Sequence, residues 1–205
     1  MLVKFNGFIG NPGYNLRRFK RGDNSELATL GRAIAFHRLP KPKKARQHVD
    51  RLIKMRPKDA FYHELRGQIL LESGNARAAV ASYRRAAQLA PKEPLILGGL
   101  GRAMLANGSG ASVKSALSVL QKAYARDPRD SSTLRNLGLA YARTGQPGQA
   151  SVVTAERYAL QSNFRQAEIH AKRAQGLLPR GTTGWLKAND IIALARKVNA
   201  RKKKR

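Results

Sequence analysis

The chain has 205 residues, no cysteine and a formal net charge of +28 at pH 7. The absence of cysteine excludes disulfide bonds and thiolate metal sites, and the sequence holds no apolar run long enough to predict a transmembrane helix. A positive charge of this size attracts anionic partners of every class, so by itself it selects neither nucleic acid, nor acidic protein, nor anionic lipid.

The first 24 residues combine glycines and a proline with a cluster of basic side chains at 17–21. This composition predicts an irregular or short-helical basic lead-in over 1–24. The same segment has no long apolar core behind a basic head, so it lacks the pattern of a secretory signal. As the sequence stands, we therefore expect a cytoplasmic protein.

From residue 25 onward, apolar residues recur at helical spacing. Start and stop signals predict four helical pairs: 26–38 with 42–55, 59–72 with 76–89, 94–106 with 112–125, and 132–144 with 147–160. A further helix is predicted over 164–177 and a terminal capping helix over 183–199. Residues 25–199 are thus expected to form one helical repeat domain of about ten helices, followed by a basic disordered tail over 200–205.

Small residues return at nearly fixed intervals in three of these pairs. Glycine recurs on the first helix at intervals of 34 and 37 residues, and alanine on the second at intervals of 37 and 34. The positions are Gly67, Gly101 and Gly138, then Ala79, Ala116 and Ala150, with Pro57, Pro91 and Pro128 closing successive pairs. Antiparallel helices approach closely where the facing side chains are small. A period of 34 is that of the tetratricopeptide repeat (TPR), so we predict an all-α, TPR-like, right-handed solenoid of antiparallel helix pairs.

Two short motifs resemble enzymatic sequence patterns, but each lacks one required residue. His63 and Glu64 could open the H-E-x-x-H helix of a zinc peptidase, but Gly67 stands where the second histidine is needed. Residues 108–115 approach the phosphate-binding loop G-x-x-x-x-G-K-S, but Val113 replaces its second glycine. The repeat explains both, because Gly67 is a helix-contact position and 108–115 joins two predicted helices. We therefore predict no enzyme, no metal and no cofactor.

The charge is concentrated at the two ends of the chain. The net charge is +12 over 1–58, +2 over 59–110, +4 over 111–160 and +10 over 161–205. The densest stretch, 41–58, carries a predicted basic patch of Lys43, Lys44, Arg51, Lys54 and Lys58, in which Lys44, Arg51 and Lys58 share one broad helical sector. Two interpretations stay open: a solvated outer face, or an anion-binding surface for nucleic acid or anionic membrane.

One string is more particular than the repeat pattern: HELRGQILLESG at 63–74, with FNGFIGNPG before it and AERYAL and WLKANDII after it. Together these segments resemble the C-terminal, TPR-containing region of bacterial zinc metallopeptidases. In that family the protease is a separate N-terminal domain with an H-E-x-x-H helix, usually exported to the periplasm for envelope quality control. The resemblance therefore implies a periplasmic, substrate-holding or partner-holding module without its catalytic domain, because this sequence lacks the zinc ligands.

The resemblance also implies that a partner is held in a concave groove lined by the first helix of each repeat. The groove positions of this sequence include Gln68, Arg102, Arg135 and Arg143, and guanidinium groups pair bidentately with carboxylates. We therefore expect a non-catalytic protein–protein interaction module whose partner is a protein or peptide with an acidic contact segment. Two alternatives stay open: a basic protein that binds nucleic acid or anionic membrane, and the accessory half of a split or truncated metalloprotease.

Overall fold

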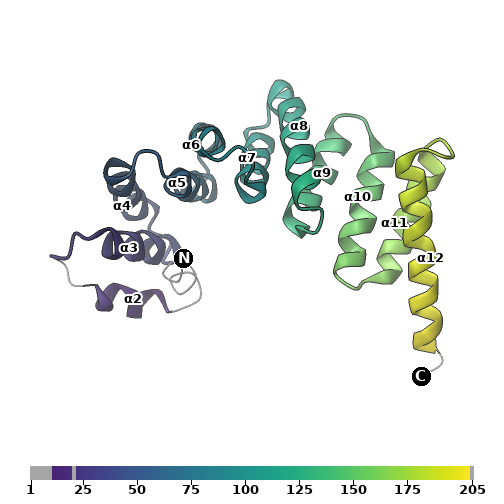
Figure 1. The fold of residues 1–205 in the computed structure, drawn as a ribbon, viewed down its shortest axis with the longest axis horizontal. Helices are drawn as coiled ribbons and strands as arrows, with labels where there is room; N and C mark the ends of the chain where they lie inside the picture. Colours follow the sequence, from purple (N-terminus) through teal and green to yellow (C-terminus); the bar gives the residue numbers. More distant parts are fainter. Residues whose placement is uncertain (1–10, 20–21, 204–205) are drawn as a thin grey trace. The chain divides into compact units, whose positions relative to one another are not determined.

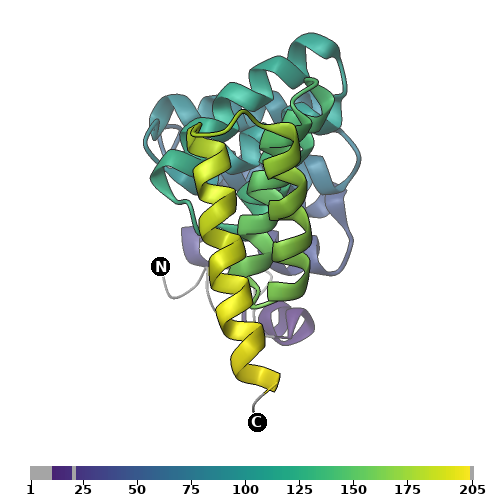
Figure 2. The same ribbon diagram turned by 90° about the vertical axis from the view of Figure 1, so that its right-hand side faces the viewer.

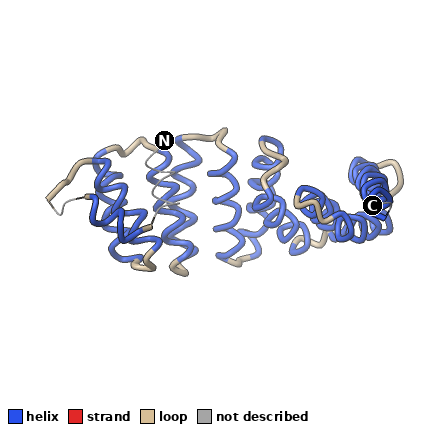
Figure 3. Tube along the Cα trace, turned by 90° about the horizontal axis from the view of Figure 1, so that it is seen from below, coloured by secondary structure: helices blue, strands red, loops and turns tan. Residues whose placement is uncertain are grey.

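The computed structural model describes residues 11–19 and 22–203, and within them every regular element is an α-helix (Figure 1, Figure 3). The predicted all-α class is therefore confirmed. The eleven helices of the described residues are α2 (Pro12–Arg18), α3 (Glu26–Arg38), α4 (Pro42–Met55), α5 (Ala60–Glu72), α6 (Ala76–Leu89), α7 (Pro94–Asn107), α8 (Gly110–Arg126), α9 (Ser131–Arg143), α10 (Pro147–Leu160), α11 (Phe164–Leu177) and α12 (Thr183–Lys203).

The four predicted helical pairs begin and end within two residues of the observed helices, whereas the C-terminal tail differs from the prediction. The lead-in contains the short helix α2, which begins where Asn11 accepts hydrogen bonds from the N–H groups of Gly13 and Tyr14 and where Pro12 fits the first turn. The predicted disordered tail is helical over 200–203, where α12 continues to Lys203. The rest of the lead-in and tail, 1–10, 20–21 and 204–205, lies outside the described residues.

The helices divide into two compact units, where the sequence predicts one repeat domain over 25–199. The first unit is Met1–Asn107 and the second is Gly108–Arg205. In a solenoid each repeat contacts mainly its neighbours, so a chain of repeats separates readily into such units. The boundary falls at the start of the near-match to a phosphate-binding loop, where Ser109 caps α8 by accepting a hydrogen bond from the N–H of Ser112. Only residues 108–109 of this segment form the turn between α7 and α8, and residues 110–115 are the first residues of α8.

In the first unit, each helix from α2 to α7 packs against the next one in the chain (Figure 1). Ser25, Asp59 and Asn75 start α3, α5 and α6, because each side chain accepts a hydrogen bond from a first-turn N–H group. The core between α3, α4 and α5 is built from large aliphatic side chains that are at most 1% exposed: Ile34, Val49, Leu52, Leu65 and Ile69. Burial of these side chains supplies the main stabilisation of the unit.

A tyrosine of the first unit lies between two glycines of neighbouring helices. A Cβ atom added to Gly67 on α5 would lie 2.7 Å from the ring of Tyr83 on α6, and one added to Gly99 on α7 would lie 2.4 Å from it. Carbon atoms do not approach so closely, so both positions need glycine. The predicted contact role of Gly67 is confirmed, and Gly99 is a second contact position that the repeat pattern did not single out.

In the second unit, α10, α11 and α12 pack side by side, and Figure 2 shows α12 running along α11. Asp130 and Asn163 cap α9 and α11 with their side chains. The core of these three helices is mostly alanine, with all of the following fully buried: Ala155, Ala167, Ala171, Ala174 and Ala188. Side chains this small let helix axes approach closely but bury little apolar surface each.

A polar network connects α8, α10 and α12 inside the second unit. The Tyr124 hydroxyl donates a hydrogen bond of 2.6 Å to Glu156, and the Lys187 ammonium lies 2.8 Å from the other carboxylate oxygen of Glu156. Lys187 also donates to the Tyr124 hydroxyl at 2.5 Å. The Glu156 side chain is only 13% exposed, so its charge depends on these partners.

The third repeat packs more loosely than the pattern predicts. Tyr141 and Ala150, which the pattern places at packing positions, are only half-buried. A Cβ atom at Gly138 would lie 3.3 Å from Thr154 and 3.4 Å from Val153, so the small position has room for a methyl group after slight adjustment. Thr154 stands four residues after Ala150 as Tyr83 stands four after Ala79, and its smaller side chain explains the looser contact.

Candidate functional site

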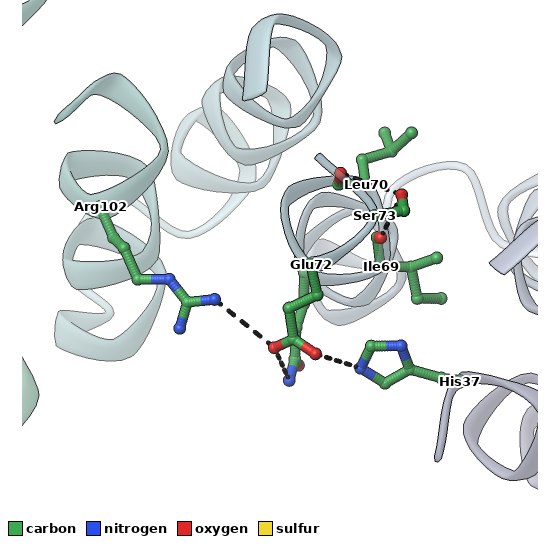
Figure 4. A network of polar contacts seen from close by, with 7 residues as sticks. His37, Ile69, Leu70, Glu72, Ser73 and Arg102 are labelled. Carbon is green, nitrogen blue, oxygen red and sulfur yellow. Dashed lines mark hydrogen bonds and ion pairs between the residues drawn. The ribbon is translucent and has the colours of Figure 1, made fainter. Parts of the chain in front are cut away.

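The predicted groove residues of the first unit meet at one carboxylate. Glu72 of α5 accepts a hydrogen bond of 3.1 Å from Gln68 and lies 3.5 Å from the Arg102 guanidinium of α7 (Figure 4). Its other oxygen lies 3.0 Å from Nε2 of His37 on α3. Arg102 thus already faces a carboxylate of its own chain, and an incoming acidic segment would compete with Glu72 for it.

The other two predicted groove residues belong to the second unit. Arg135 and Arg143 lie on α9, and both are exposed. Their spacing of eight residues places them on the same side of one helix. The predicted contact of Gln68, Arg102, Arg135 and Arg143 with an acidic partner stays a prediction, and the structure brings only Gln68 and Arg102 together, through Glu72.

A pocket of about 840 Å³ lies at the N-terminal ends of α3, α5 and α7, within the first unit. Its apolar wall includes Leu27, Phe61 and Leu95, the second residue of each of these helices. These three residues follow one another at intervals of 34, so successive repeats contribute the same position. Leu27 is 49% exposed and Leu95 is 58% exposed, so both leucines of this row present apolar surface to solvent.

A three-residue contact shapes one side of this pocket. Arg56 donates a hydrogen bond of 3.0 Å to the Glu26 carboxylate, and the Tyr62 hydroxyl donates to the same oxygen. These partners hold the pKa of Glu26 below its ordinary value, so this carboxylate is charged at neutral pH. Burial and the hydrogen bond to Glu26 raise the pKa of Tyr62, so the tyrosine stays a neutral donor.

The pocket is acidic on a strongly basic chain. Among the described residues, four carboxylates line it and Arg56 is the one basic lining residue; the four are Glu26, Asp59, Glu64 and Glu93. Asp59 also caps α5 by accepting a hydrogen bond of 2.9 Å from the N–H of Phe61. The chain has only 12 acidic residues in all, so a third of them converge on this one surface.

The predicted basic patch lies on the outer side of α4. Lys43, Lys44, Arg51 and Lys54 on this helix and Lys58 just after it are all exposed. The Lys44 ammonium lies 5.5 Å from the ring centroid of Phe36, a cation–π distance. The opposite side of α4 is buried through Ala45, Val49 and Leu52, as the helical pattern predicts. These contacts fit a solvated face, and anion binding by the patch stays a prediction.

The near-match to a zinc peptidase has a structural explanation. Nε2 of His63 lies 2.9 Å from the carbonyl oxygen of Pro57, which ties the start of α5 to the preceding turn. Within the described residues, histidines and carboxylates form no cluster that could hold a metal ion. The same part of the chain contains no helix with the length and apolarity needed to span a bilayer.

Comparisons with known proteins define the class of this fold. Residues 64–112 match the tetratricopeptide repeat family. MamA of Desulfovibrio magneticus RS-1 is a solved structure with a TM-score of 0.67 and 20% identity, covering 78% of this chain and 92% of that chain. YrrB, described as a TPR protein with an unusual peptide-binding site, has a TM-score of 0.64 and 16% identity, covering 83% of this chain and 88% of its own. The predicted TPR-like solenoid is therefore confirmed.

One curated relative has a closer sequence. CycH of Rhizobium meliloti (strain 1021), a cytochrome c-type biogenesis protein, is 32% identical over 96 residues. These residues make up 47% of this chain and 25% of CycH, so the match spans about a quarter of the relative's length. The comparisons support the TPR part of the predicted resemblance and give no support to a metallopeptidase. They also give no support to a nucleic-acid or lipid partner.

Proposed function

We propose that the chain is a non-catalytic protein-interaction module that holds a segment of a partner polypeptide in the pocket formed by α3, α5 and α7. The observation that carries this proposal is the apolar row of Leu27, Phe61 and Leu95 in the pocket, contributed by three successive repeats, in which Leu27 and Leu95 are exposed and Phe61 is partly buried. A monomeric protein gains nothing from exposing large side chains in a hollow, whereas a bound segment would remove them from water.

The second unit lacks the corresponding row, which favours the first unit as the binding part. The next residue in the same register is Ser132 of α9, the second residue of that helix. A hydroxyl at this position offers no apolar surface to a partner. The description of YrrB as a peptide-binding TPR protein supports the class of ligand, because the two chains share a fold.

A library of random peptides displayed on phage tests this proposal without knowledge of the natural partner. The wild-type chain is compared with Leu27→Ser/Leu95→Ser, and the matched control is Leu186→Ser/Leu194→Ser on α12, whose leucines are 50% and 47% exposed. We expect the wild type and the control to retain a common set of peptides that the pocket variant loses. Equal retention by all three proteins would disprove binding in the pocket, provided that circular dichroism shows them folded.

The likeness to CycH favours a second candidate function. It names a cellular process in which the chain would take part, and it does not name a binding surface. The 32% identity over 96 residues favours a part in cytochrome c-type biogenesis. Deletion of the gene in its own organism, followed by haem staining of denatured extracts, tests this role. Loss of covalently attached haem that is restored by the wild-type gene would support it, and an unchanged haem pattern would contradict it.

A further inference from the structure

We infer that the outer faces of α4 and α6 form a second binding surface of the first unit, whose ligand is the phosphate backbone of a nucleic acid duplex. This surface is separate from the pocket at the N-terminal ends of α3, α5 and α7, and its ligand belongs to another class of molecule. Successive repeats place an exposed cation at the same two positions of their second helix.

The first of these positions lies two residues before the buried alanine of the second helix, and the second position lies six residues after it. In α4, α6 and α8 this alanine is Ala45, Ala79 and Ala116, each fully buried. All six positions are exposed and basic and form two rows of cations: Lys43, Arg77 and Lys114 in one, and Arg51, Arg85 and Lys122 in the other. The corresponding positions of α10 are Gly148 and Glu156, so the pattern ends there.

The regularity of these rows exceeds what the composition supplies. Lysine and arginine are 40 of the 205 residues, a fifth of the chain, so composition alone would put a cation at one of the six positions and not at all of them. A solvated helix face needs polar residues but fixes no position for them. Like charges at equal intervals match a ligand that itself carries charge at regular intervals, as a phosphate backbone does.

α4 and α6 lie next to each other, so their cations belong to one surface. The Arg66 guanidinium of α5 donates a hydrogen bond of 2.7 Å to Asp50 of α4 and another of 2.8 Å to the Ser82 hydroxyl of α6. One side chain thus connects both helices. The same ion pair neutralises Asp50, the single carboxylate of α4, and α6 has no acidic residue.

The row cations of α4 and α6 have no counter-charge of their own. Within the described residues Lys43, Arg51 and Arg77 form no ion pair, and Arg85 donates a hydrogen bond to the uncharged Gln88. Further exposed cations on the same two helices are Lys44, Arg46, Lys54 and Arg84. Uncompensated like charges repel one another, and a bound polyanion removes that repulsion.

The other side chains of the surface favour a nucleic acid over a membrane. A helix enters the lipid interface with large exposed apolar residues, but α6 exposes none and α4 exposes only Met55, its last residue. Unpaired bases stack on exposed aromatic residues, but α4 has none and Tyr83 of α6 is 5% exposed. The available contacts are therefore to phosphates, which favours a duplex and gives no base specificity.

The spacing of the two positions also fits a duplex. They are eight residues apart on one helix, which corresponds to about 12 Å along its axis. The major groove of a DNA duplex is about 12 Å wide and has a phosphate strand on each side. Cations of the two rows can therefore contact both strands across one groove.

Fluorescence anisotropy with a labelled, mixed-sequence DNA duplex at several salt concentrations tests this surface. Lys43→Gln/Arg51→Gln/Arg77→Gln/Arg85→Gln removes four phosphate contacts, so the slope of log K against log salt should become shallower by about 4. We expect the affinity near physiological salt to fall by about tenfold or more. The matched control Arg165→Gln/Arg173→Gln/Arg180→Gln/Lys197→Gln removes the same charge from exposed positions of the second unit and should lower the affinity less than about twofold, because distant charges are screened.

Vesicles of phosphatidylcholine and phosphatidylserine serve as the second probe, with sedimentation as the measurement. Loss of duplex binding in the row variant alone, while circular dichroism shows all proteins folded, supports the inference. Equal losses in the row variant and the control, or an unchanged affinity in the row variant, would overturn it, because the duplex would then respond to net charge. Vesicle binding with the same dependence on the row cations would overturn the nucleic acid as the ligand. None of these variants changes a residue of the pocket, so the proposed peptide binding is tested separately.

Discussion

The two compact units of this chain achieve helix packing by different means. Between α3, α4 and α5 of the first unit the buried side chains are mostly leucine, isoleucine and valine, whereas between α10, α11 and α12 of the second unit they are mostly alanine. Large side chains bury more apolar surface, and alanine allows helices to approach more closely. The second unit therefore buries less apolar surface per core residue and adds the polar network of Tyr124, Glu156 and Lys187.

This difference extends to the surfaces. In the first unit the second residues of α3, α5 and α7 are apolar and line an acidic pocket, while the corresponding residue of α9 is Ser132. Both units expose leucines, but only in the first do two of them line this pocket together. The comparison teaches that repeats of one pattern can differ in core composition and in the residue type at the same helix position.

The largest effect is expected when the aliphatic core of the first unit is opened. Leu65 is 1% exposed, and Leu65→Ala leaves a cavity among side chains that cannot close around it. We expect the free energy of unfolding to fall by about 3 kcal/mol, measured by urea denaturation followed by far-UV circular dichroism. A loss below about 1 kcal/mol would mean that the core of the first unit tolerates truncation almost as well as surface positions do. The first unit would then not depend on its large aliphatic side chains more than the second unit depends on its alanines.

A matched pair of glycine substitutions compares the helix contacts of the two units. Gly67→Ala places a methyl group 2.7 Å from the Tyr83 ring, so we expect a loss of about 2 kcal/mol. Gly138→Ala meets its nearest atom at 3.3 Å, and the higher helix propensity of alanine offsets that contact, so stability should stay within about 0.5 kcal/mol of the wild type. Equal losses in urea denaturation would show that the third repeat is packed as tightly as the first unit.

The polar network gives the third comparison. Lys187→Met leaves the Glu156 carboxylate, 13% exposed, without its cation, and we expect a loss of about 1 to 2 kcal/mol. Lys172→Met on α11 removes an exposed pair with Glu168 and should cost at most about 0.5 kcal/mol. Trp185, the single tryptophan of the sequence, lies on α12, so its fluorescence during urea denaturation reports on this unit.

The same network has a pH dependence with a defined sign. Burial lowers the pKa of the Lys187 ammonium, but its hydrogen bonds to Glu156 and Tyr124 act in the opposite direction and leave the pKa above its ordinary value of 10.5. A raised pKa stabilises the folded state at lower pH, and this contribution is lost as the pH rises through the folded-state pKa. The stability difference between the wild type and Lys187→Met should therefore be constant near neutral pH and shrink above pH 10.5. A difference that grows with pH would contradict this assignment.

The helices could be predicted from the sequence because their start signals are local. Ser25, Asp59 and Asn75 each satisfy an N–H group two or three residues further on, and Pro57 and Pro91 stand between helices at fixed spacing. The tightness of the contacts could not be predicted. Whether a glycine faces Tyr83 or Thr154 depends on how helices rotate against each other, and the pattern of small residues is the same in both cases.

The candidate site was predicted only in part. Gln68 and Arg102 lie together, and the carboxylate that joins them is Glu72 of the same chain, so the structure gives both groove residues a partner within the chain. The pocket was missed because Leu27 and Leu95 look like ordinary helix residues until their exposure is known. The sequence does carry a signal for this pocket, because Leu27, Phe61 and Leu95 recur at intervals of 34 residues. The small residues that define the repeat show the same period, so the apolar row is not distinguished by its spacing alone.

The smallest expected effect compares the caps of α5 and α9. Asp59 accepts one hydrogen bond, from the N–H of Phe61, whereas Asp130 accepts from the N–H groups of Ser132 and Thr133 and from the Thr133 hydroxyl. We expect Asp59→Ala to cost about 0.5 kcal/mol and Asp130→Ala about 1 kcal/mol in urea denaturation, because more donors lose their acceptor at α9. If Asp59→Ala instead stabilised the chain, relief of repulsion among the pocket carboxylates would outweigh the lost cap, and the acidic character of the pocket would be stronger than its ion pairs suggest.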